Sequence, residues 1–590
     1  MNNQELAKVF YEISDYLEMD KVAFKPYAYQ KAAIALESME EDVEDIYRRG
    51  GIKDLEEIPG VGKSIAEKIE EYLKTGKIQY YQQFKKRLPL DLEEIIAVEG
   101  MGPKRAKLLY QKLGVRNVKE LEKAAKAHKI AALEGFGEKT EKNLLEGIAF
   151  LKRSKGRFLL GEILPKVKEI LDKLKALKEV EQISEAGSVR RRKETIGDVD
   201  ILITAKNLHP VRKKSSNGAK KVMDFFVQLP NITKIWGKGT TKSSIRLREG
   251  FDVDLRVVSK KSFGSALQYF TGSKEHNIVL RRIAIKKGMK LNEYGLFKGK
   301  KMIAGWYENG VYKALGLSWI EPELREDQGE LEAARNGELP KIIGYKDIKG
   351  DLHCHSAWDG GTNTIEVMAK AAQDMGYQYI GIADHTKFLR IENGLDEKEL
   401  EQQRKEIDKL NEKLAPYRTK GSDAGFHILQ GCEANILSDG SIDIKDKALE
   451  KLDFVIAGIH SAFKMEKSKM TERMIKAMRN PNVDIISHPT GRILKKRDEY
   501  QIDFDKILKV AKETKTILEI NAWPERLDLN EKNIKKAKEA GVKMVINTDS
   551  HDKNHMRFMN FGIAQARRGW AEKSDIINSQ PLAKLLQYFK

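Results

Sequence analysis

Seven short apolar runs in the second half of this 590-residue chain each end in polar residues, and they constrain the fold more than any other feature. The runs are DIKGDLHCH, YIGIADH, FHILQGCEAN, FVIAGIH, VDIISHP, TILEINAW and KMVINTDSH. Helical patterns separate them. Strands that alternate with helices form parallel sheets, and seven such units predict a barrel-like closure. In a barrel of this kind, the residues that follow the strands gather at one end.

Histidines and carboxylates occupy these strand ends, and eight of the eleven histidines lie after residue 350. Closure of the barrel would bring together His353, His355, His385, Glu433, His460, His488, Asp549 and His551. Such a set of imidazoles and carboxylates predicts a site for two or three transition-metal ions, with Mn²⁺, Zn²⁺ or Fe²⁺ favoured over Ca²⁺. These ions activate water and neutralise phosphate oxygens, which indicates hydrolysis of a phosphoester.

The first half carries a second candidate metal site. In the run TIGDVDILI, Asp198 and Asp200 share one face of a predicted strand, because successive side chains alternate between faces. The run REGFDVDLRVV places Asp252 and Asp254 in the same way. Carboxylates held this close repel each other unless a cation or a proton lies between them. We therefore expect Asp198, Asp200 and Asp254 to hold two Mg²⁺ or Mn²⁺ ions for nucleotidyl transfer.

A turn upstream of these aspartates, in GSVRRRKETIGDVD, supports the same interpretation. Gly187 and Ser188 are expected to offer backbone N–H and hydroxyl donors to phosphates, and Arg191 a bidentate positive charge. A single D-x-D pair would be typical of a solvated strand edge. The turn and the second D-x-D strand together favour the phosphate-transfer site.

Positive charge is concentrated in the first half. Residues 1–350 hold 67 Lys and Arg against 51 Asp and Glu, whereas residues 351–590 hold 40 against 37. An excess of this kind favours a polyanionic partner such as nucleic acid. Three similar turns, EEIPGVGKSIAEKI, IAVEGMGPKRAKLL and AALEGFGEKTEKNL, each place Gly-x-Gly before a helix start, where backbone N–H groups can bind phosphate. They resemble helix-hairpin-helix motifs, which grip the DNA backbone without reading sequence, and the candidate DNA-binding residues are Gly60, Gly62, Lys63, Gly100, Gly102 and Lys104.

Several classes of protein are disfavoured. No apolar run approaches the ~20 residues that span a bilayer, and the start of the chain lacks the pattern of a signal peptide. Two cysteines cannot build a disulfide framework, which is typical of a reducing compartment. We expect a monomer in the cytoplasm, at the nucleoid, with no membrane partner.

The first half resembles a known family. GSVRRRKETIGDVD, VDLRVV, YFTGSKEHN and LNEYGLF are similar to the palm and thumb of family X DNA polymerases, small repair enzymes of the nucleotidyltransferase superfamily. The resemblance implies metal roles for Asp198, Asp200 and Asp254, and triphosphate roles for Ser188 and Arg191. It implies further nucleotide contacts from Gly187, Gly197, Tyr269, Phe270, Gly272 and Asn277.

Three further residues take roles from the same resemblance. Arg281 matches a template-contacting arginine, and Arg256 matches a residue that helps control palm geometry. Lys68, just after the first hairpin turn, matches a lysine that forms a Schiff base with 5′-deoxyribose phosphate. Anchoring of a DNA 5′-phosphate is the role that we expect for this region, and lyase activity through Lys68 stays an open alternative.

The predicted barrel resembles the polymerase and histidinol phosphatase (PHP) domain. In that family, the residues that match His353, His355, Glu433 and Asp549 surround one metal ion. The residue that matches Glu433 also bridges to a second metal ion, which the residues matching His460 and His488 hold. The residues that match His385 and His551 serve a third metal ion. The family usually has H-S-x-x-S-D-G after the second histidine, whereas HSAWDGG puts Asp359 one place early and Gly360 at the aspartate position. Either a backbone adjustment lets Asp359 reach the ion, or the third site is weakened.

These features predict a multidomain chain of the bacterial and archaeal type of family X. The expected order is a helix-hairpin-helix, lyase-like domain (1–85), helix-hairpin-helix fingers (86–150), an α+β nucleotidyltransferase palm (151–258), a thumb (259–320), a linker (321–346) and a distorted (β/α)7 PHP barrel (347–590).

The expected function is a gap-filling DNA polymerase in repair, acting on gapped or primer-template DNA with a 5′-phosphate and on deoxynucleoside triphosphates. The barrel would add 3′–5′ exonuclease or other phosphoesterase activity, including cleavage at abasic sites or removal of 3′-phosphates. Two alternatives stay open: a barrel whose metals serve structure only, and a non-catalytic scaffold that binds DNA ends.

Overall fold

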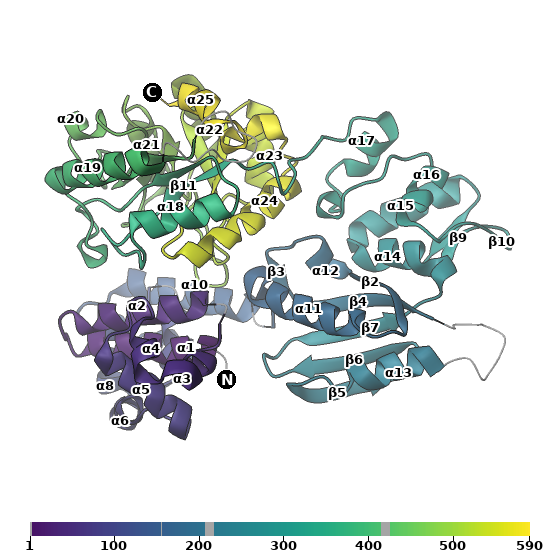
Figure 1. Ribbon diagram of the computed structural model, residues 1–590, viewed down its shortest axis with the longest axis horizontal. Coiled ribbons are helices and arrows are strands. Elements are labelled where there is room, and N and C mark those ends of the chain that lie inside the picture. The colour runs from purple at the N-terminus through teal and green to yellow at the C-terminus, as the bar shows by residue number, and fades with distance from the viewer. Residues whose placement is uncertain are drawn as a thin grey trace.

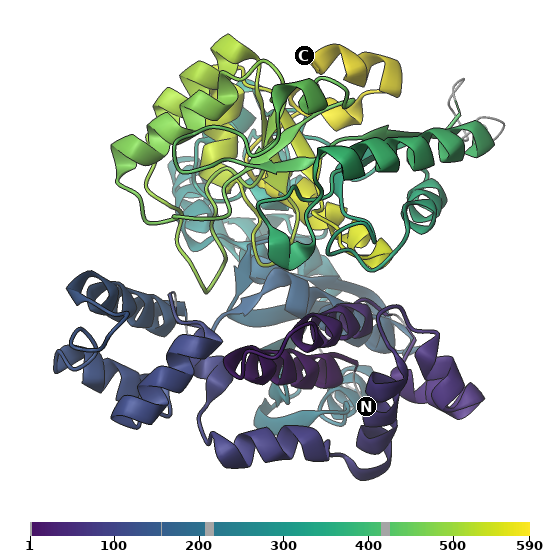
Figure 2. The same cartoon turned by 90° about the vertical axis from the view of Figure 1, so that its left-hand side faces the viewer.

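The computed structural model describes residues 3–39, 41–98, 100–154, 156–206, 217–414 and 425–589. It contains an N-terminal helical region, a palm, a thumb and a C-terminal barrel, in the predicted order. Figures 1 and 2 show the barrel above both the N-terminal helices and the palm. Within these described ranges, no helix is both long and apolar enough to cross a membrane.

The N-terminal region consists of short helices around one continuous buried core that runs from Leu6 to Ile148. Its helices are α1 (Asn3–Met19), α2 (Lys25–Ser38), α3 (Val43–Gly50), α4 (Ile52–Glu56), α5 (Lys63–Thr75), α6 (Gln79–Arg87), α7 (Leu92–Ile96), α8 (Pro103–Leu113), α9 (Val118–Lys126) and α10 (Glu138–Ser154). The first glycine of each hairpin turn, Gly60, Gly100 and Gly135, has φ between 78° and 85°. Glycine adopts this left-handed conformation without steric cost, which is why the repeated motif needs it.

The palm is built on a five-stranded sheet in the order β2-β4-β7-β6-β5. Its elements are β1 (Phe158–Leu159), α11 (Leu160–Lys175), β2 (Val180–Glu185), α12 (Gly187–Arg190), β3 (Thr195–Ile196), β4 (Asp198–Ala205), α13 (Asn217–Phe226), β5 (Ile232–Lys238), β6 (Lys242–Leu247) and β7 (Asp252–Val257). Val199, Ile201 and Ile203 on one face of β4 are fully buried in a core shared with α11 and α13. The aspartates of β4 therefore lie on the opposite face.

The thumb follows the palm and joins the acidic stretch that was expected to be a linker. Its elements are η1 (Lys260–Ser262), α14 (Phe263–Thr271), α15 (Lys274–Lys286), β8 (Lys290–Asn292), β9 (Gly295–Lys298), β10 (Lys301–Ala304) and α16 (Glu308–Ala314), followed by η2 (Pro322–Leu324) and α17 (Glu330–Asn336). The acidic stretch is packed, because Glu323, Arg325 and Glu330 are almost fully buried. Arg325 donates to Glu308 at 2.6 Å, and Arg190 of the palm donates to the same carboxylate at 2.7 Å.

The barrel has two parallel sheets, β11-β12-β13 and β14-β15-β16-β17-β18. Its strands are β11 (Gly350–Cys354), β12 (Tyr379–Ile382), β13 (His427–Gln430), β14 (Glu433–Asn435), β15 (Ile456–Gly458), β16 (Ile485–Ile486), β17 (Ile517–Asn521) and β18 (Met544–Asn547). Two bridges join the sheets: one between Cys354 of β11 and Ser550 after β18, and one between His385 after β12 and Glu433 of β14. All seven predicted runs form strands, and FHILQGCEAN is divided into β13 and β14.

Helices and short turns surround these strands. They are α18 (Ile365–Asp374), η3 (Arg390–Glu392), α19 (Glu397–Leu414), α20 (Asp446–Leu449), α21 (Lys467–Met478), α22 (Phe504–Thr514), α23 (Glu531–Ala540), η4 (Lys553–Phe558), α24 (Met559–Arg568), η5 (Lys573–Asp575), η6 (Ile577–Ser579), α25 (Leu582–Leu585) and η7 (Leu586–Tyr588). The barrel contacts the palm through polar groups: Glu194 of the palm accepts from the guanidinium of Arg492 at 2.5 Å and from the amide of Gln565 at 2.7 Å. These contacts fix the barrel against the loop between α12 and β3.

The packing of α14 on α16 gives a stability prediction. A Cβ atom at Gly264 would lie 2.2 Å from the carbonyl carbon of Tyr307 and 2.4 Å from the amide nitrogen of Glu308, which is backbone and cannot move aside cheaply. Overpacking of this kind costs about 1–3 kcal/mol, so Gly264→Ala should lower the melting temperature of the thumb and palm by several degrees in calorimetry. Gly310→Ala is the control, since a Cβ there meets no atom within 4 Å. Equal melting of both variants would contradict the close approach of the two helices.

Candidate metal centres in the palm and the barrel

Three carboxylates, Asp198, Asp200 and Asp254, lie together at the starts of β4 and β7 and are named the palm carboxylates. The two strands run parallel, with Asp200 opposite Asp254. Burial, followed by the charges of Asp198 and Asp254, raises the pKa of Asp200 to about 6. Lys242 lies 2.7 Å from a carboxylate oxygen of Asp254, and Arg256 lies 3.6 Å from it. The three carboxylates repel one another, and a bound cation would relieve that repulsion. Clustered carboxylate oxygens are suitable ligands for Mg²⁺ or Mn²⁺.

The neighbouring carboxylate, Asp252, is already paired. Arg246 donates to its two oxygens at 2.8 and 2.9 Å, and the indole N–H of Trp236 donates at 2.8 Å. These hydrogen bonds, with Arg246 as the main cause, hold the pKa of Asp252 below its usual value. Asp252 is therefore held by side chains from β5 and β6, although it lies opposite Asp198 in the sheet.

A cavity of about 440 Å³ adjoins the palm carboxylates. It is lined by Arg157, Gly187, Ser188, Arg191, Lys193, Gly197, Asp198, Asp200, Tyr269, Phe270, Gly272, Lys274, Asn277 and Arg281. All residues predicted from the sequence to contact the nucleotide are in this set. Arg157, Lys193 and Lys274 are additions that sequence reasoning missed, although Lys193 and Lys274 lie inside the quoted motifs.

Two residues show how the wall of this cavity is built. Gly187 has a φ of 61°, a left-handed conformation that favours glycine, and a Cβ atom there would lie 2.8 Å from a carboxylate oxygen of Asp200. The guanidinium of Arg191 donates to Glu326 at 3.0 Å and to the backbone carbonyl of Thr271. Arg191 is thus held at the cavity by the thumb and by the acidic stretch.

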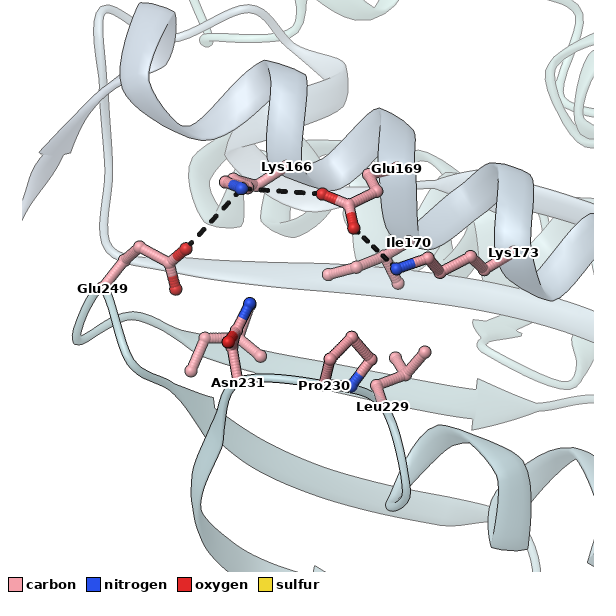
Figure 3. A pocket seen from close by; sticks show the side chains of 9 residues that line it. Lys166, Glu169, Ile170, Lys173, Leu229, Pro230, Asn231 and Glu249 are labelled. Atoms are coloured by element: carbon pink, nitrogen blue, oxygen red, sulfur yellow. Dashed lines mark hydrogen bonds and ion pairs between the residues drawn. The ribbon is translucent and has the colours of Figure 1, made fainter. Parts of the chain in front are cut away.

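A much smaller hollow, of about 20 Å³, lies between α11 and the loops that lead into β5 and β7. Figure 3 shows ion pairs of Lys166 with Glu169 and of Glu169 with Lys173 along α11, and one of Lys166 with Glu249 on the facing loop. It contains no residue predicted to act in catalysis or binding. Its size and its ion pairs leave no room for a nucleotide.

The candidate lyase residue, Lys68, lies on α5 with its amine 3.0 Å from the backbone oxygen and 3.1 Å from the hydroxyl of Ser64. Burial lowers the pKa of Lys68; Lys25 acts in the same direction, and Glu67 and Glu71 oppose it. A lowered pKa favours the neutral, nucleophilic amine. The position is compatible with either of the two predicted roles.

The other predicted DNA contacts are spread over the first half. Gly60, Gly100 and the exposed Lys63 lie at the hairpin turns, while Gly62 and Gly102 cap α5 and α8 without a side-chain hydrogen bond. Lys104 lies 3.5 Å from Glu18. The guanidinium of Arg256 lies 4.4 Å over the ring of Phe270, and Arg281 donates to the backbone oxygen of Asn277 at 3.2 Å.

The eight predicted barrel ligands converge and are named the barrel cluster: His353, His355, His385, Glu433, His460, His488, Asp549 and His551. Glu433 is central, because one of its oxygens lies 2.9 Å from His488 and 3.3 Å from His460, and the other lies 3.0 Å from His385 and 3.3 Å from His353. All four contacts use the Nε2 atom of the ring.

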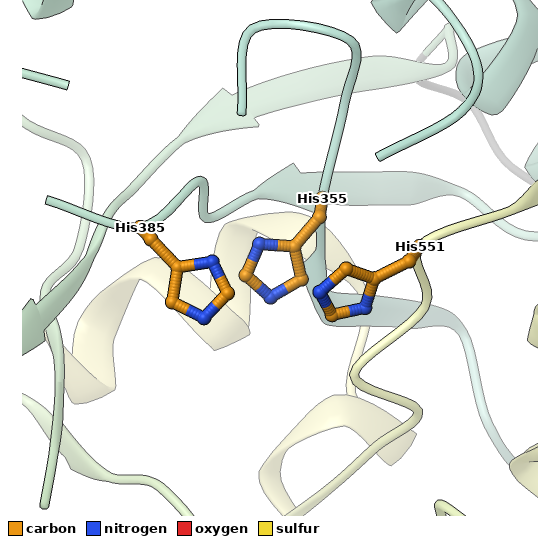
Figure 4. Close-up of side chains that lie close together, drawn as sticks. All are labelled: His355, His385 and His551. Atoms are coloured by element: carbon orange, nitrogen blue, oxygen red, sulfur yellow. The ribbon is translucent and has the colours of Figure 1, made fainter. Parts of the chain in front are cut away.

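The donor set fits metal ions. The Nε2 atoms of His353 and His355 are buried without a hydrogen-bond partner, and both face the carboxylate of Asp549, at 3.8 and 3.3 Å. Figure 4 shows the ring of His355 between those of His385 and His551, at centroid distances of 4.3 and 4.1 Å. Ligand atoms from these three histidines lie within 4.8 Å of one another, as a shared ion requires.

Polar partners orient the rings from the opposite side, through Nδ1. His353 is bonded to Glu519 at 2.7 Å and His460 to Asn435 at 3.1 Å. Such bonds fix the tautomer of a ligating histidine. Sequence reasoning missed Glu519 and Asn435, although both lie within the quoted runs, Glu519 in the middle of β17 and Asn435 at the end of β14.

Burial and charge shift the titration of the cluster. Burial lowers the pKa of His460 and of His551 to about 4, which keeps both rings neutral. Burial opposes the charged form of His353, but Glu519 and Glu433 outweigh it and raise the pKa. Burial likewise opposes ionisation of Glu433, but His353 and His460 hold its pKa well below the usual range. A divalent ion would replace the proton on His353 and keep the carboxylate ionised.

Asp359 occupies the Nδ1 side of the rings. Its carboxylate is bonded to Nδ1 of His355 at 2.7 Å and of His385 at 2.8 Å, and accepts from the backbone N–H of His385 at 2.9 Å. The shift of one position in the sequence thus leaves Asp359 beside two predicted ligands. Asp384 lies close by, and burial together with Asp359 raises its pKa to about 8.

The palm carboxylates give a prediction about pH. A carboxyl whose folded-state pKa is raised destabilises the folded chain above that pKa, near 6, and the penalty vanishes as pH falls toward the ordinary value of 3.8. Asp200→Asn should therefore raise the melting temperature in EDTA at about pH 7.5, and the gain should shrink toward about pH 4. Asp252→Asn, which removes a carboxylate paired with Arg246, should give no gain. A melting temperature for Asp200→Asn at or below that of the unchanged protein at pH 7.5 would contradict the prediction.

Comparison with protein families matches most of the chain. A helix-hairpin-helix domain matches residues 1–78 and a SAM-like helix-hairpin-helix tandem matches 92–149. The DNA polymerase beta palm matches 161–235, the DNA polymerase beta thumb 266–326 and the PHP domain 351–522. Polymerase palms and PHP domains generally use divalent metal ions.

Curated relatives agree with these matches. The chain is 35% identical over 595 residues, covering all of both chains, to the DNA polymerase/3′-5′ exonuclease PolX of Bacillus subtilis. It is 34% identical over 213 residues, 34% of this chain and 78% of the relative, to a probable phosphatase of Thermoanaerobacter sp.. A probable phosphatase of Caldicellulosiruptor saccharolyticus is 30% identical over 215 residues, 35% of this chain and 81% of the relative. The chain therefore belongs to the family X DNA polymerases that carry a C-terminal PHP domain.

Proposed function

We propose that this chain fills short gaps in DNA during repair and trims DNA 3′ ends at a separate site. The observation that carries the proposal is the presence of two distinct ligand sets, the palm carboxylates beside a cavity of about 440 Å³ and the barrel cluster. Its relative in Bacillus subtilis is named a DNA polymerase and 3′-5′ exonuclease, which supports the same pairing of activities. A non-catalytic scaffold would need neither set.

At the palm, Asp198, Asp200 and Asp254 would hold Mg²⁺ or Mn²⁺. When bound, such ions activate the primer 3′-hydroxyl and stabilise the triphosphate. Ser188 and Arg191 would bind the triphosphate of a deoxynucleotide, with the Gly187 turn and Gly197 close to it. Tyr269, Phe270, Gly272 and Asn277 would contact the sugar and base. We assign the template contact to Arg281 and control of palm geometry to Arg256.

The N-terminal region would hold gapped DNA and its 5′-phosphate. The candidate contacts are Gly60, Gly62, Lys63, Gly100, Gly102 and Lys104. Lys68 is the candidate nucleophile if the region also removes 5′-deoxyribose phosphate. The predicted domain limits, at residues 85, 150, 258, 320 and 346, are part of this proposal, as are a monomeric state and a place at the nucleoid.

The barrel would hydrolyse phosphoesters with Mn²⁺, Zn²⁺ or Fe²⁺ held by the barrel cluster, and Asp359 would orient two of the rings. Ions there supply an activated water and neutralise a phosphate oxygen. A second candidate activity is removal of a terminal 3′-phosphate, because two relatives of the barrel are named probable phosphatases. A barrel that binds metal for structure alone would show no turnover.

Separate inactivation tests the two sites. Asp198→Ala with Asp200→Ala should abolish primer extension and leave trimming intact, whereas His353→Ala with His355→Ala should do the reverse. Labelled primer in a 5′-phosphorylated single-nucleotide gap, incubated with Mn²⁺ with and without deoxynucleotides, reports both reactions on one gel. Primer extension by the palm variant would contradict the assignment of polymerase activity to the palm carboxylates. Undiminished trimming by the barrel variant would place that activity elsewhere.

The buried partner of His353 gives a graded test of the barrel. Glu519→Gln keeps the shape of the side chain but weakens the bond to Nδ1, so trimming should fall about 10–100-fold and extension should not change. The exposed Glu513 of α22 provides the control Glu513→Gln, which should trim normally. Equal rates for Glu519→Gln and the unchanged protein would show that this bond does not support the site.

A further inference from the structure

A helix of the N-terminal region reaches the loop that serves the barrel cluster. The hydroxyl of Tyr27 donates to the backbone oxygen of Asp359 at 3.0 Å, and the amine of Lys31 donates to the backbone oxygen of Gly361 at 3.1 Å. Tyr27 and Lys31 lie four residues apart on α2, so they share one face of the helix. Figure 1 shows α2 on the side of the N-terminal region that faces the barrel.

The loop that α2 contacts is bonded to three histidines of the barrel cluster, to two through their rings and to the third through its backbone. The carboxylate of Asp359 is bonded to His355 and His385, as described above. The backbone N–H of Thr362 donates to the backbone oxygen of His551 at 2.8 Å. These are the three histidines of Figure 4. A shift of the loop backbone would therefore move the carboxylate that orients the rings of His355 and His385, and it would disturb the backbone that carries His551.

Charged and aromatic groups surround the contact between α2 and the barrel loop. The amine of Lys31 lies 4.9 Å over the ring of Tyr27 and faces the carboxylates of Asp359 and Glu392. Burial lowers the pKa of Lys31, and the two carboxylates oppose that effect. Burial and the same two carboxylates also raise the pKa of the Tyr27 hydroxyl, which keeps it a hydrogen-bond donor.

The other side of Lys31 adjoins the first hairpin turn. A Cβ atom at Gly60 would lie 3.0 Å from Cβ of Lys31 and 3.2 Å from its carbonyl carbon. Lys31 thus lies between a predicted DNA-binding turn and the loop of the barrel cluster.

We propose that Tyr27 and Lys31 are positioning residues of the barrel centre. By holding the backbone at Asp359 and Gly361, they keep the Asp359 carboxylate on His355 and His385. The N-terminal region must then stay docked for full metal affinity and full trimming. This inference rests on the proposed phosphoesterase function of the barrel.

The geometry favours positioning over obstruction. Asp359 meets the rings at Nδ1, whereas the carboxylates of Glu433 and Asp549 face Nε2 of His385 and His355. The loop held by α2 therefore lies on the side of the rings away from the oxygen ligands. A helix that blocked the site would have to lie on the opposite side.

The test compares Tyr27→Phe, Lys31→Met and the double variant with Lys25→Met, which removes an exposed lysine from the same helix. Binding of Mn²⁺ to the metal-free full-length protein is followed by electron paramagnetic resonance, and trimming is measured at low and saturating Mn²⁺. We expect the double variant to bind at least one Mn²⁺ about tenfold more weakly or worse, with trimming lost at low Mn²⁺ and largely restored at saturation. The Lys25→Met variant should bind Mn²⁺ and trim like the unchanged protein, and primer extension should be the same in all variants.

Unchanged Mn²⁺ binding and trimming in the double variant would overturn the inference, as would faster trimming, which would show that docking blocks the site. Tyr27→Phe removes only a hydroxyl, so it keeps the test valid if Lys31→Met fails to fold. If the unchanged protein does not trim at all, the proposed barrel function fails. The Mn²⁺ binding curves then decide the positioning inference independently.

Discussion

Carboxylates buried beside one another must be compensated by positive charge, and this requirement governs both candidate sites and the contacts between domains. In the palm, the residual repulsion is visible in the raised pKa of Asp200. In the barrel, Glu433 is buried to 1% exposure, yet His353, His460 and His385 beside it hold its pKa well below the usual range. The palm therefore keeps unsatisfied negative charge beside its cavity, whereas the barrel compensates its carboxylates with rings that an ion can bind.

Pairing of buried opposite charges also joins the barrel to the palm. Arg568 of α24 has no exposed side-chain surface, and it donates to Glu326, to Glu531 and to the backbone oxygen of Arg191. Glu326 in turn accepts from the guanidinium of Arg191, which lines the palm cavity. One wall of the predicted nucleotide pocket is therefore supported from behind by the barrel. Arg492 repeats the pattern four residues beyond His488, through its pair with Glu194.

Sequence reasoning located the strand ends because period-two alternation and strand–helix alternation are local signals. Asp198, Asp200 and the eight members of the barrel cluster could be named in this way. Glu519 could not be named, because its partner His353 lies 166 residues away. A glutamate within an apolar run does not indicate which distant residue it contacts. The acidic stretch was expected to be a linker because its composition is polar, but its charges are paired with Glu308 of the thumb, Arg191 of the palm and Arg567 of the barrel.

The pairing of buried charges also argues against two independent modules on a tether. Separation of the barrel from the palm would leave Glu194 without Arg492 and Gln565, and Glu326 without Arg568. The arginines of these pairs are almost fully buried at the contact between the two domains, so their ionic partners and their burial are lost together when the domains separate. The barrel thus supports part of the palm. The two domains meet at the loop between α12 and β3, where Arg191 lines the palm cavity and Glu194 contacts the barrel.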